Sequence, residues 1–188
     1  MELSICIATF GDPQWHELAL ARALPSAARQ ADCEIVTEHG ASLHEARNRA
    51  AERARGEWLV FLDADDELAD GYAAAILAAS GDLRAPAVSW VAPDGTASPP
   101  TLLDDRHIER MNSCVIGTGI RRSMFLDIGG FGSWPAWEDW ALFLRAYRSG
   151  ATIEHVPAAV YRAHVRPGSR NQTVANPHRL ARQIRAAS

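Results

Sequence analysis

A strand-like run of apolar residues ends in a cluster of acids, and this junction constrains the chain more than any other feature. Residues 58–62 read Trp-Leu-Val-Phe-Leu, and four carboxylates follow within five positions, at Asp63, Asp65, Asp66 and Glu67. An apolar run rich in β-branched and aromatic residues is typical of a strand inside a parallel sheet, covered on both faces. Ligands of open α/β sheets bind beyond the carboxyl ends of such strands. The junction therefore predicts a ligand site at the edge of an α/β sheet.

The acid cluster itself favours a metal site. Carboxylates packed together repel one another unless positive charge lies between them, and hard cations such as Mg²⁺ or Mn²⁺ prefer oxygen ligands. The alternative is a polar turn that caps the next helix, because Asp is also a favoured turn and N-cap residue. The residues alone leave both interpretations open.

Length and composition indicate a globular protein. The chain has 188 residues, 47% hydrophobic and 22% charged, which is ordinary for one soluble domain with a short tail. No apolar stretch approaches the roughly 18 residues of a membrane span, so no integral membrane segment is expected. The start, Met1–Ile5, lacks the basic region of a signal peptide. We therefore expect a cytoplasmic protein.

Lysine is absent, so all 19 basic residues are arginines. This excludes chemistry that needs an amine, such as a Schiff-base lysine or a Walker-type phosphate loop. The net charge of -4 argues against general nucleic-acid binding by the whole chain.

Charge is distributed unevenly along the chain. No Asp or Glu follows Glu154, whereas six arginines do. They are Arg162, Arg166, Arg170, Arg179, Arg182 and Arg185. This basic segment could meet an anionic ligand, or bring the protein peripherally to an anionic membrane surface. The alternative, which we favour for so short a helix, is that the tail docks against the domain.

The first half of the chain alternates strands with helices. Periodicity and turn signals predict strands at 3–10, 33–37 and 58–62, and helices at 13–30, 42–54 and 73–79. Ser42 and Glu45 match a capping box at the start of the second helix. Such alternation implies right-handed crossovers and a parallel sheet with helices on its faces.

The second half is less regular. It predicts strands at 87–92, 153–156 and 159–163, an apolar run at 114–120, a short helix capped by Ser123, a helix at 137–149, and a last helix starting at Asn176-Pro177. We therefore divide the chain into a nucleotide-type α/β half, about 1–92, a mixed half that would supply a second substrate site, about 93–170, and a basic helical tail, 171–188.

Several segments point to a family when taken in order. They are Ala46-Arg47-Asn48-Arg49, the junction Asp63-Ala64-Asp65, Gly117–Ser123, Gly129-Gly130-Phe131, Trp137–Leu142, and Val160–His164 with Pro167-Gly168-Ser169. In this order and spacing the chain resembles family-two glycosyltransferases with the GT-A fold, over roughly residues 3–170. The resemblance implies an α/β fold with a Rossmann-like, mostly parallel central sheet flanked by helices.

The resemblance also implies an activity. Such enzymes move a sugar from a nucleotide diphosphate sugar to an acceptor hydroxyl, with inversion at the anomeric carbon. We therefore expect Mn²⁺ or Mg²⁺ as cofactor and a UDP-, GDP- or dTDP-sugar as donor.

The resemblance assigns residues to the donor. Asp63, Ala64 and Asp65 match the family's Asp-x-Asp motif, with Asp65 as the main metal ligand. The remaining donor candidates are Ala8, Thr9 and Phe10 at the end of the first strand, Glu38 in place of the family's base-contacting acid, and Arg47 near the base or phosphates. The alternative for Arg47 is a solvated helix position.

Asp139 matches the family's general base. It lies near the start of a helix between Trp137 and Trp140, where aromatic bulk would raise the pKa of a carboxylate. The alternative is that Glu138 and Asp139 only complement the helix dipole. Trp134, Trp137 and Glu138 are the acceptor-binding candidates, because aromatic faces stack on sugar rings.

His164 matches a position that approaches the metal or the diphosphate in many relatives. Here Val165 and Arg166 separate it from the Pro-Gly-Ser turn, which departs from the family pattern. A hydrogen-bonded structural histidine is therefore the alternative. Arg166 and Arg170 are candidate diphosphate partners, because guanidinium groups bind phosphate oxygens in bidentate fashion.

Two other functions remain open. A nucleotidyltransferase could run two-metal chemistry from a similar acid cluster. A GT-A domain could also bind a nucleotide or glycan without turnover. The acceptor and the oligomeric state are not indicated by the sequence.

Overall fold

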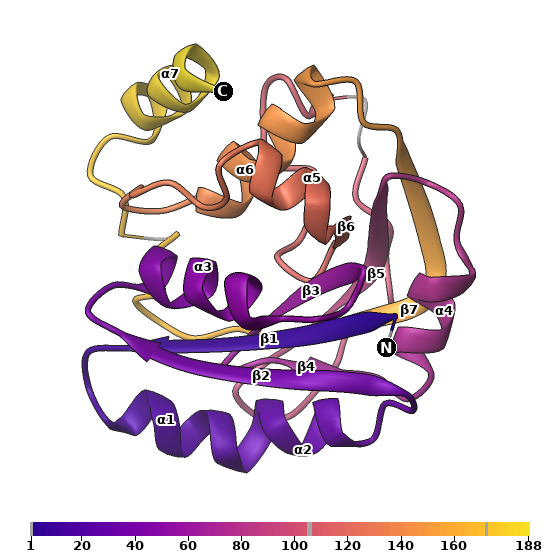
Figure 1. Cartoon of the computed structure of the whole chain (residues 1–188). Helices are drawn as coiled ribbons and strands as arrows, with labels where there is room; N and C mark the ends of the chain where they lie inside the picture. Colours follow the sequence, from indigo (N-terminus) through magenta and orange to yellow (C-terminus); the bar gives the residue numbers. More distant parts are fainter. Residues whose placement is uncertain (1, 105–106, 172) are drawn as a thin grey trace.

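The computed structural model of the chain describes residues 2–104, 107–171 and 173–188. Over these residues a sheet of seven strands, in the order β2-β1-β3-β6-β5-β7-β4, forms the centre of the molecule and helices lie on both sides (Figure 1). The strands are β1 (Leu3–Phe10), β2 (Cys33–Gly40), β3 (Trp58–Asp63), β4 (Glu67–Leu68), β5 (Leu83–Val91), β6 (Gly119–Arg121) and β7 (Ile153–His164). The predicted α/β class is confirmed.

The helices cover the two faces of the sheet. They are α1 (Gln14–Leu18), the π-helical turn η1 (Ala19–Ala23), α2 (Leu24–Ala28), α3 (Leu43–Arg53), α4 (Tyr72–Ala78), α5 (Arg122–Asp127), α6 (Glu138–Arg148) and α7 (Pro177–Ala187). In Figure 1, α1 and α2 lie below β1 and β2, whereas α3, α5 and α6 lie above them. No helix among the described residues is long and apolar enough to cross a membrane.

The first half is the parallel part of the sheet. β1 pairs in parallel with β2 on one side and with β3 on the other. The register sets Ala8 opposite both Glu38 and Asp63, so three donor candidates share one edge of the sheet. β1 has the predicted bounds, and β2 extends three residues beyond the predicted strand.

The predicted helix at 13–30 is one helical path with a local change of winding. α1, η1 and α2 follow one another without a break from residue 14 to residue 28. Pro25 lies at the start of α2 and has no N–H to donate. A π-helical turn directly before it accommodates the missing hydrogen bond.

The predicted capping box opens α3. The hydroxyl of Ser42 accepts a hydrogen bond from the backbone N–H of Glu45 at 3.4 Å, and the helix begins at Leu43. Its buried alanines, Ala46, Ala50 and Ala51, allow it to pack closely over β1 and β2. This packing places the side chains of α3 above the carboxyl edge of the sheet.

The second half makes the sheet mixed rather than mostly parallel. β6 runs antiparallel to both β3 and β5, whereas β5 and β7 pair in parallel. The two strands predicted at 153–156 and 159–163 are one strand, β7. Val156 pairs with Pro86 and Val160 pairs with Ala87, so the intervening residues form a bulge that keeps the strand continuous past its proline.

Two local interpretations are corrected. The acid cluster is not a turn that caps the next helix, because Glu67 begins the short strand β4, which pairs antiparallel with β7. The helix predicted at 73–79 is α4, which begins at Tyr72, after Gly71 in the left-handed conformation (φ 76°). Ser123 does not cap α5, whose N-cap is Arg121.

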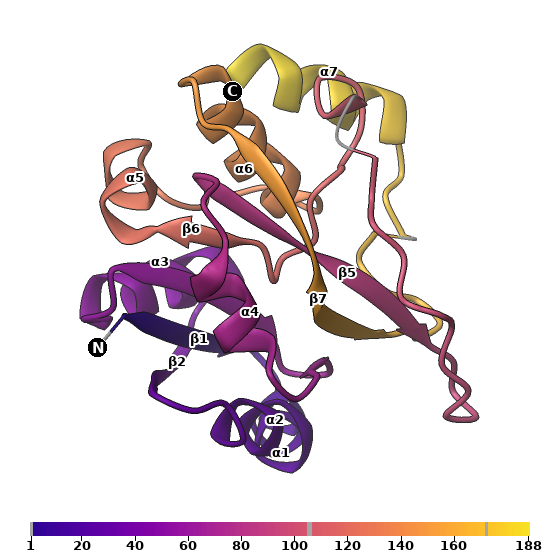
Figure 2. The same cartoon turned by 90° about the vertical axis from the view of Figure 1, so that its right-hand side faces the viewer.

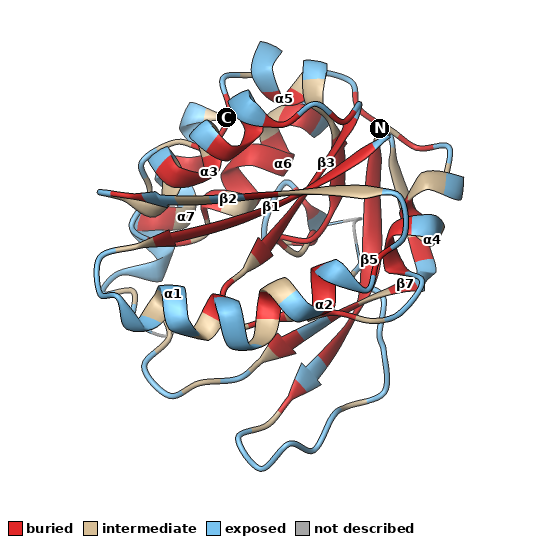
Figure 3. Ribbon diagram, turned by 60° about the horizontal axis from the view of Figure 1, so that its bottom comes forward, coloured by how far each residue is buried: buried red, intermediate tan, exposed pale blue. Residues whose placement is uncertain are grey.

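α6 and α7 pack against each other on one side of the sheet. The residues of α6 from Trp140 to Leu144 are buried in the core. α7 lies against α6 through Leu180 and Ile184, its only buried residues, while Arg179 and Arg182 are exposed. Figure 3 shows the same contrast across the molecule, with buried strands at the centre and exposed outer faces on the helices. Figure 2 shows α7 and α6 on one side of the sheet, away from α1 and α2.

Candidate functional site

Three aspartates converge where β3 ends. Asp63 is the last residue of β3, and Asp65 and Asp66 follow in the turn to β4. Each offers a carboxylate oxygen that lies within 4.8 Å of the others. The junction of apolar strand and acids therefore forms a compact set of oxygen donors at the sheet edge.

Asp66 is the most deeply placed of the three and ties this turn to β7. Its Oδ2 accepts a hydrogen bond from the hydroxyl of Tyr161 at 2.8 Å, and its Oδ1 accepts one from the backbone N–H of His164 at 2.8 Å. Burial, together with the charges of Asp65 and Asp63, raises the pKa of Asp66 well above its usual range. Asp66 thus holds the turn against β7 through these two hydrogen bonds.

Asp65 is paired with an arginine of the loop after β7. Its Oδ2 accepts a hydrogen bond from Nε of Arg166 at 2.5 Å, and its backbone carbonyl accepts one from Arg22 at 2.8 Å. The guanidinium of Arg166 also lies over the ring of Trp15, 4.5 Å from its centroid. The two residues inserted before the Pro-Gly-Ser turn therefore bring a positive charge onto the proposed metal ligand.

The ring of His164 is directed to a different acid. Its Nε2 lies 2.9 Å from Oε2 of Glu67, and both side chains are partly buried. Among the described residues, the group of converging ligand atoms contains the three aspartates and does not include this ring. The geometry matches the hydrogen-bonded histidine that the sequence left as the alternative.

Arg47 is the buried connection between the two ends of the site. Its Nη2 donates to Oδ1 of Asp63 at 2.5 Å and its Nη1 donates to Oε1 of Glu138 at 2.8 Å. Its guanidinium also lies over the ring of Phe131, 5.0 Å from the centroid. Only 3% of the residue is exposed, so the solvated alternative is wrong. Burial opposes its charge, but Asp63 and Glu138 outweigh that effect and raise the pKa of Arg47.

Asn48 explains how two distant motifs come together. Its side-chain amide donates to the carbonyl of Phe131 at 2.9 Å and accepts from the N–H of Phe131 at 2.8 Å. The preceding Gly130 has φ 64°, and a Cβ there would lie 2.6 Å from Oδ1 of Asn48. The Gly-Gly-Phe turn is therefore held directly against α3.

Glu138 binds two arginines at once. Besides Arg47, it accepts hydrogen bonds from Nη1 and Nη2 of Arg170, each at 3.0 Å. Arg170 also donates to the backbone carbonyls of Trp134 and Pro135. Burial would raise the pKa of Glu138, but the two arginines hold it below its usual value. The predicted acceptor residue Glu138 and the predicted diphosphate partner Arg170 thus form one ion pair.

Asp139 occupies the first turn of α6. Its Oδ2 accepts a hydrogen bond from Nδ2 of Asn112 at 2.8 Å, and its Oδ1 accepts one from the backbone N–H of Trp140 at 2.9 Å. Burial and the charge of Glu138 raise the pKa of Asp139 to about 6. Asn112 was not predicted from the sequence, because one asparagine in a long irregular segment carries no distinguishing pattern.

The turn into α6 is conformationally strained. Trp137 has φ 58° and ψ 29°, the left-handed region that bulky residues rarely occupy. Its ring packs edge-on against Trp140, with 6.3 Å between the ring centroids. Such strain persists where surrounding contacts enforce it, and it is common at functional sites.

A cavity of about 260 Å³ joins residues predicted for the donor with residues predicted for the acceptor. It is lined by Phe10, Ser42, Leu43, His44, Ser133, Trp134, Pro135, Glu138 and Arg170. We call it the central cavity. The sequence did not single out Leu43, His44, Ser133 or Pro135, and it predicted Ser42 only as a helix cap.

The remaining donor candidates lie along the same sheet edge but outside this cavity. Thr9 Oγ1 lies 3.0 Å from Nδ1 of His39, across the pairing of β1 with β2. Glu38 forms ion pairs with Arg49 and Arg53 of α3. The acid that the sequence offered for base recognition is therefore already neutralised.

Comparisons with known proteins agree with this architecture. Residues 32–94 match the family described as Glycosyl transferase family 2. No curated protein sequence matches the chain significantly. The structure of S. aureus TarS 1-349 in complex with UDP-GlcNAc shares 18% identity and a TM-score of 0.71, covering 94% of this chain and 62% of that one.

Two further structures share the fold. The same TarS fragment in complex with UDP has 19% identity and a TM-score of 0.67, covering 89% of this chain and 61% of that one. GalNAc-T7 with UDP, GalNAc and Mn²⁺ has 14% identity and a TM-score of 0.61, covering 88% of this chain and 44% of that one. The chain thus spans about three fifths or less of the lengths of these proteins. The family match at residues 32–94 and the fold shared over most of the chain confirm the resemblance to family-two glycosyltransferases with the GT-A fold.

Proposed function

We propose that this protein transfers a sugar from a nucleoside diphosphate sugar to an acceptor hydroxyl, with inversion, with a divalent metal and with Asp139 as general base. The observation that carries the proposal is the buried Arg47, which joins Asp63 at the strand end to Glu138, the neighbour of Asp139. A donor bound at the acid cluster and the base Asp139 on α6 would then lie in the same active site.

The acid cluster fits a hard divalent cation. Three carboxylates offer oxygens within 4.8 Å of one another, and burial with the neighbouring acid Asp65 raises the pKa of Asp63 despite its contact with Arg47. This excess of buried negative charge is what Mn²⁺ or Mg²⁺ would relieve. Asp65 and Asp63 would hold the ion, and ligation by His164 would require its ring to leave Glu67. When bound, the ion supplies positive charge that stabilises a departing diphosphate.

The donor site would follow the carboxyl edge of the sheet. The nucleobase would lie near Ala8, Thr9 and Phe10, with Glu38 at its side. The TarS structures hold UDP-GlcNAc or UDP, and GalNAc-T7 holds UDP with Mn²⁺, which favours a uridine nucleotide over the GDP or dTDP alternatives.

Two arginines are suited to the diphosphate. Arg166 forms an ion pair with Asp65, and Arg170 forms one with Glu138. Guanidinium groups exchange carboxylate oxygens for phosphate oxygens readily, because both anions accept bidentate, charge-assisted hydrogen bonds. Donor binding would thus move these arginines from the acids to the diphosphate and leave Asp65 open for the ion.

The transfer step would use Asp139. Its carboxylate takes the proton of the acceptor hydroxyl as that oxygen forms the new bond to the anomeric carbon. The bond from this carbon to the diphosphate oxygen breaks on the opposite face, so the configuration inverts. A pKa of about 6 leaves Asp139 ionised at neutral pH and more basic than an ordinary aspartate.

The acceptor would enter the central cavity. Trp134 lines it, and Trp137 lies at the adjoining turn, where their rings could stack on sugar faces. We also keep the division into a donor-binding half, about 1–92, and an acceptor half, about 93–170, as part of the proposal.

Thermal-shift titration with UDP, GDP and dTDP, each with and without Mn²⁺, tests the donor and the metal together. We expect UDP with Mn²⁺ to raise the melting temperature most. Product analysis then tests the reaction, because a glycosyltransferase releases a nucleoside diphosphate and a nucleotidyltransferase releases pyrophosphate. Pyrophosphate release would replace the proposal with the nucleotidyltransferase, and binding without turnover of any donor sugar would favour the non-catalytic domain.

A further inference from the structure

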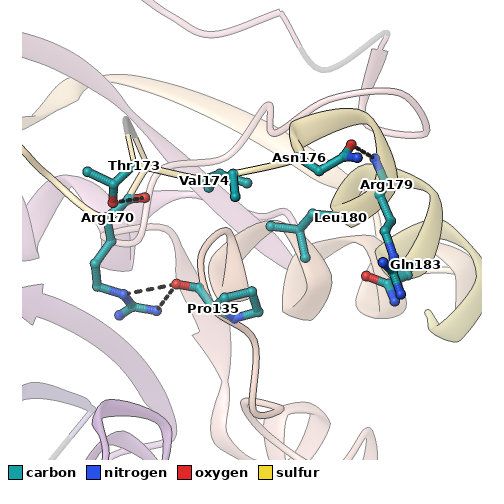
Figure 4. A pocket seen from close by; sticks show the side chains of 9 residues that line it. Pro135, Arg170, Thr173, Val174, Asn176, Arg179, Leu180 and Gln183 are labelled. Atoms are coloured by element: carbon teal, nitrogen blue, oxygen red, sulfur yellow. Dashed lines mark hydrogen bonds between the residues drawn. The ribbon is translucent and has the colours of Figure 1, made fainter.

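A second cavity lies beside the central cavity, between residues 173–176 and α7. Its volume is about 430 Å³. It is lined by Pro135, Arg170, Thr173, Val174, Ala175, Asn176, Arg179, Leu180 and Gln183, and we call it the tail cavity. Figure 4 shows Arg170 at one end, Arg179 and Gln183 at the other, and Pro135 and Leu180 between them. Pro135 and Arg170 line both cavities, so the two are adjacent.

The residues that line the tail cavity carry positive charge and no negative charge. Its charged members are Arg170 and Arg179, and the sequence after Glu154 contains no acid. Arg170 is engaged by Glu138 and by two backbone carbonyls. Arg179 uses its backbone N–H for the Asn176 cap, at 2.9 Å, and the residue is exposed. Arg179 is therefore the guanidinium that can meet a ligand.

The rest of the lining suits a polyhydroxylated chain. Pro135, Val174 and Leu180 offer apolar surface, whereas Thr173, Asn176 and Gln183 offer hydroxyl or amide groups. Sugars present both kinds of surface, with apolar C–H faces and hydroxyl edges. This mixture favours a glycan or polyol over a purely ionic ligand.

Helix α7, which carries Arg179 and forms one wall of the tail cavity, is packed against α6. Leu180 and Ile184 are buried against α6. Arg148 of α6 donates hydrogen bonds to the carbonyls of Arg185 and Ser188, each at 2.7 Å. Because α7 is held at its buried face and at its last turn, Arg179 has a defined position at the rim of the cavity.

We propose that the tail cavity binds an anionic group of the acceptor, a phosphate or carboxylate on a glycan or polyol chain, and that Arg179 recognises it. This inference rests on the proposed transferase function, since it places the acceptor's charged group beside the cavity in which its hydroxyl would react. It names the acceptor class that the sequence left open.

Binding of short anionic and neutral probes to the full-length chain tests this assignment without any donor. The probes are trigalacturonate, maltotriose carrying a 6-phosphate, and neutral maltotriose, each titrated by calorimetry. Arg179→Gln is the test variant. Arg182→Gln is its matched control, because Arg182 is exposed on the same helix but does not line the cavity. Thermal melting checks that both variants fold.

We expect the wild-type protein and R182Q to bind an anionic probe at least about tenfold more tightly than R179Q does, the effect of one charge-assisted hydrogen bond. Binding of neutral maltotriose should be equal in all three proteins. The two anionic probes decide whether phosphate or carboxylate is preferred.

Three results would overturn the assignment. Equal losses of affinity for the anionic probes in R179Q and R182Q would indicate diffuse electrostatic attraction to α7. Equal affinity of the wild-type protein for anionic and neutral probes would show that the tail cavity does not recognise an anionic group. Cosedimentation with phosphatidylglycerol vesicles, without binding of either anionic trisaccharide, would make α7 a membrane-contacting element instead. Because no donor is present, a protein that binds the probes but transfers no sugar would refute the transferase and leave the anion site standing.

Discussion

At the scale of single residues, Asp139 and Arg47 decide whether the proposed site can work. Asp139 is held by Asn112 and by the N–H of Trp140, and Arg47 neutralises the acids on either side. Asp139 is proposed to take the proton of the acceptor hydroxyl, and Arg47 holds Asp63 and Glu138 in place. The two therefore respond differently to substitution.

Asp139→Asn should abolish transfer while nucleotide binding remains. The amide has nearly the same shape but cannot take a proton from the acceptor hydroxyl, and loss of a general base costs roughly 10²- to 10⁴-fold in rate. Calorimetry with UDP and Mn²⁺ checks that the donor still binds. Turnover at the wild-type rate would remove Asp139 from the base role.

The pH dependence of transfer should report the raised pKa of Asp139. Because its carboxylate must be ionised to act, kcat/KM should fall as the pH drops through about 6. The contribution of Asp139 to folding stability has the opposite pH dependence, because it decreases as the pH rises. A folded-state pKa above the unfolded value means that the folded state binds the proton more tightly, so this group's contribution to stability is lost as the pH rises from about 4 to 6. A flat rate profile between pH 5 and 7 would contradict the assignment.

Arg47→Ala should destabilise the fold as well as the site. Removing the guanidinium leaves Asp63 and Glu138 near each other without their shared buried counter-charge, at a cost of about 3–5 kcal/mol. Urea unfolding measures the change. Arg49→Ala is the matched control on the same helix. Its side chain is half exposed and lies 3.8 Å from Glu38, so this ion pair contributes about 1 kcal/mol or less. Equal effects of the two substitutions would show that Arg47 is not the central connection.

At the scale of elements, the loop after β7 couples the metal site to the arginines. Arg166 of this loop holds Asp65, and Arg170 holds Glu138, so one short segment contacts both ends of the site. A loop with few buried apolar contacts can rearrange at low cost, which suits an element that exchanges protein acids for a bound diphosphate. The anchoring of this loop depends on charge more than on packing.

Arg166→Ala should therefore raise the affinity for Mn²⁺ in the absence of a donor, because the arginine no longer competes for Asp65. An increase of about tenfold corresponds to the loss of one competing charge-assisted contact. Electron paramagnetic resonance of free Mn²⁺ measures it. Arg162→Ala, an exposed neighbour on β7, should leave the affinity unchanged. Unchanged or weaker binding in R166A would show that Arg166 and the ion do not share Asp65.

At the scale of the whole molecule, the GT-A fold gathers short segments from along the chain at one edge of the sheet. β1, β2 and β3 bring Ala8, Glu38 and Asp63 into register, and α3 and α6 bring Arg47 and Glu138 together above them. The elements with strong local patterns, β1, α3 and α6, were predicted nearly to the residue. β4 and the continuous β7 were missed, because their pairing depends on partners that local periodicity does not reveal.

The sequence by itself determined the alternation of elements, the acid cluster at the end of β3, the family resemblance and the basic tail, since these follow from periodicity and residue type within short windows. Only the tertiary structure decided which charges meet. Arg47 and Glu138 are 91 positions apart, and Arg166 and Asp65 are 101 apart. Such ion pairs form because charges that folding removes from water need a partner of opposite charge. No local sequence pattern shows which two residues will meet.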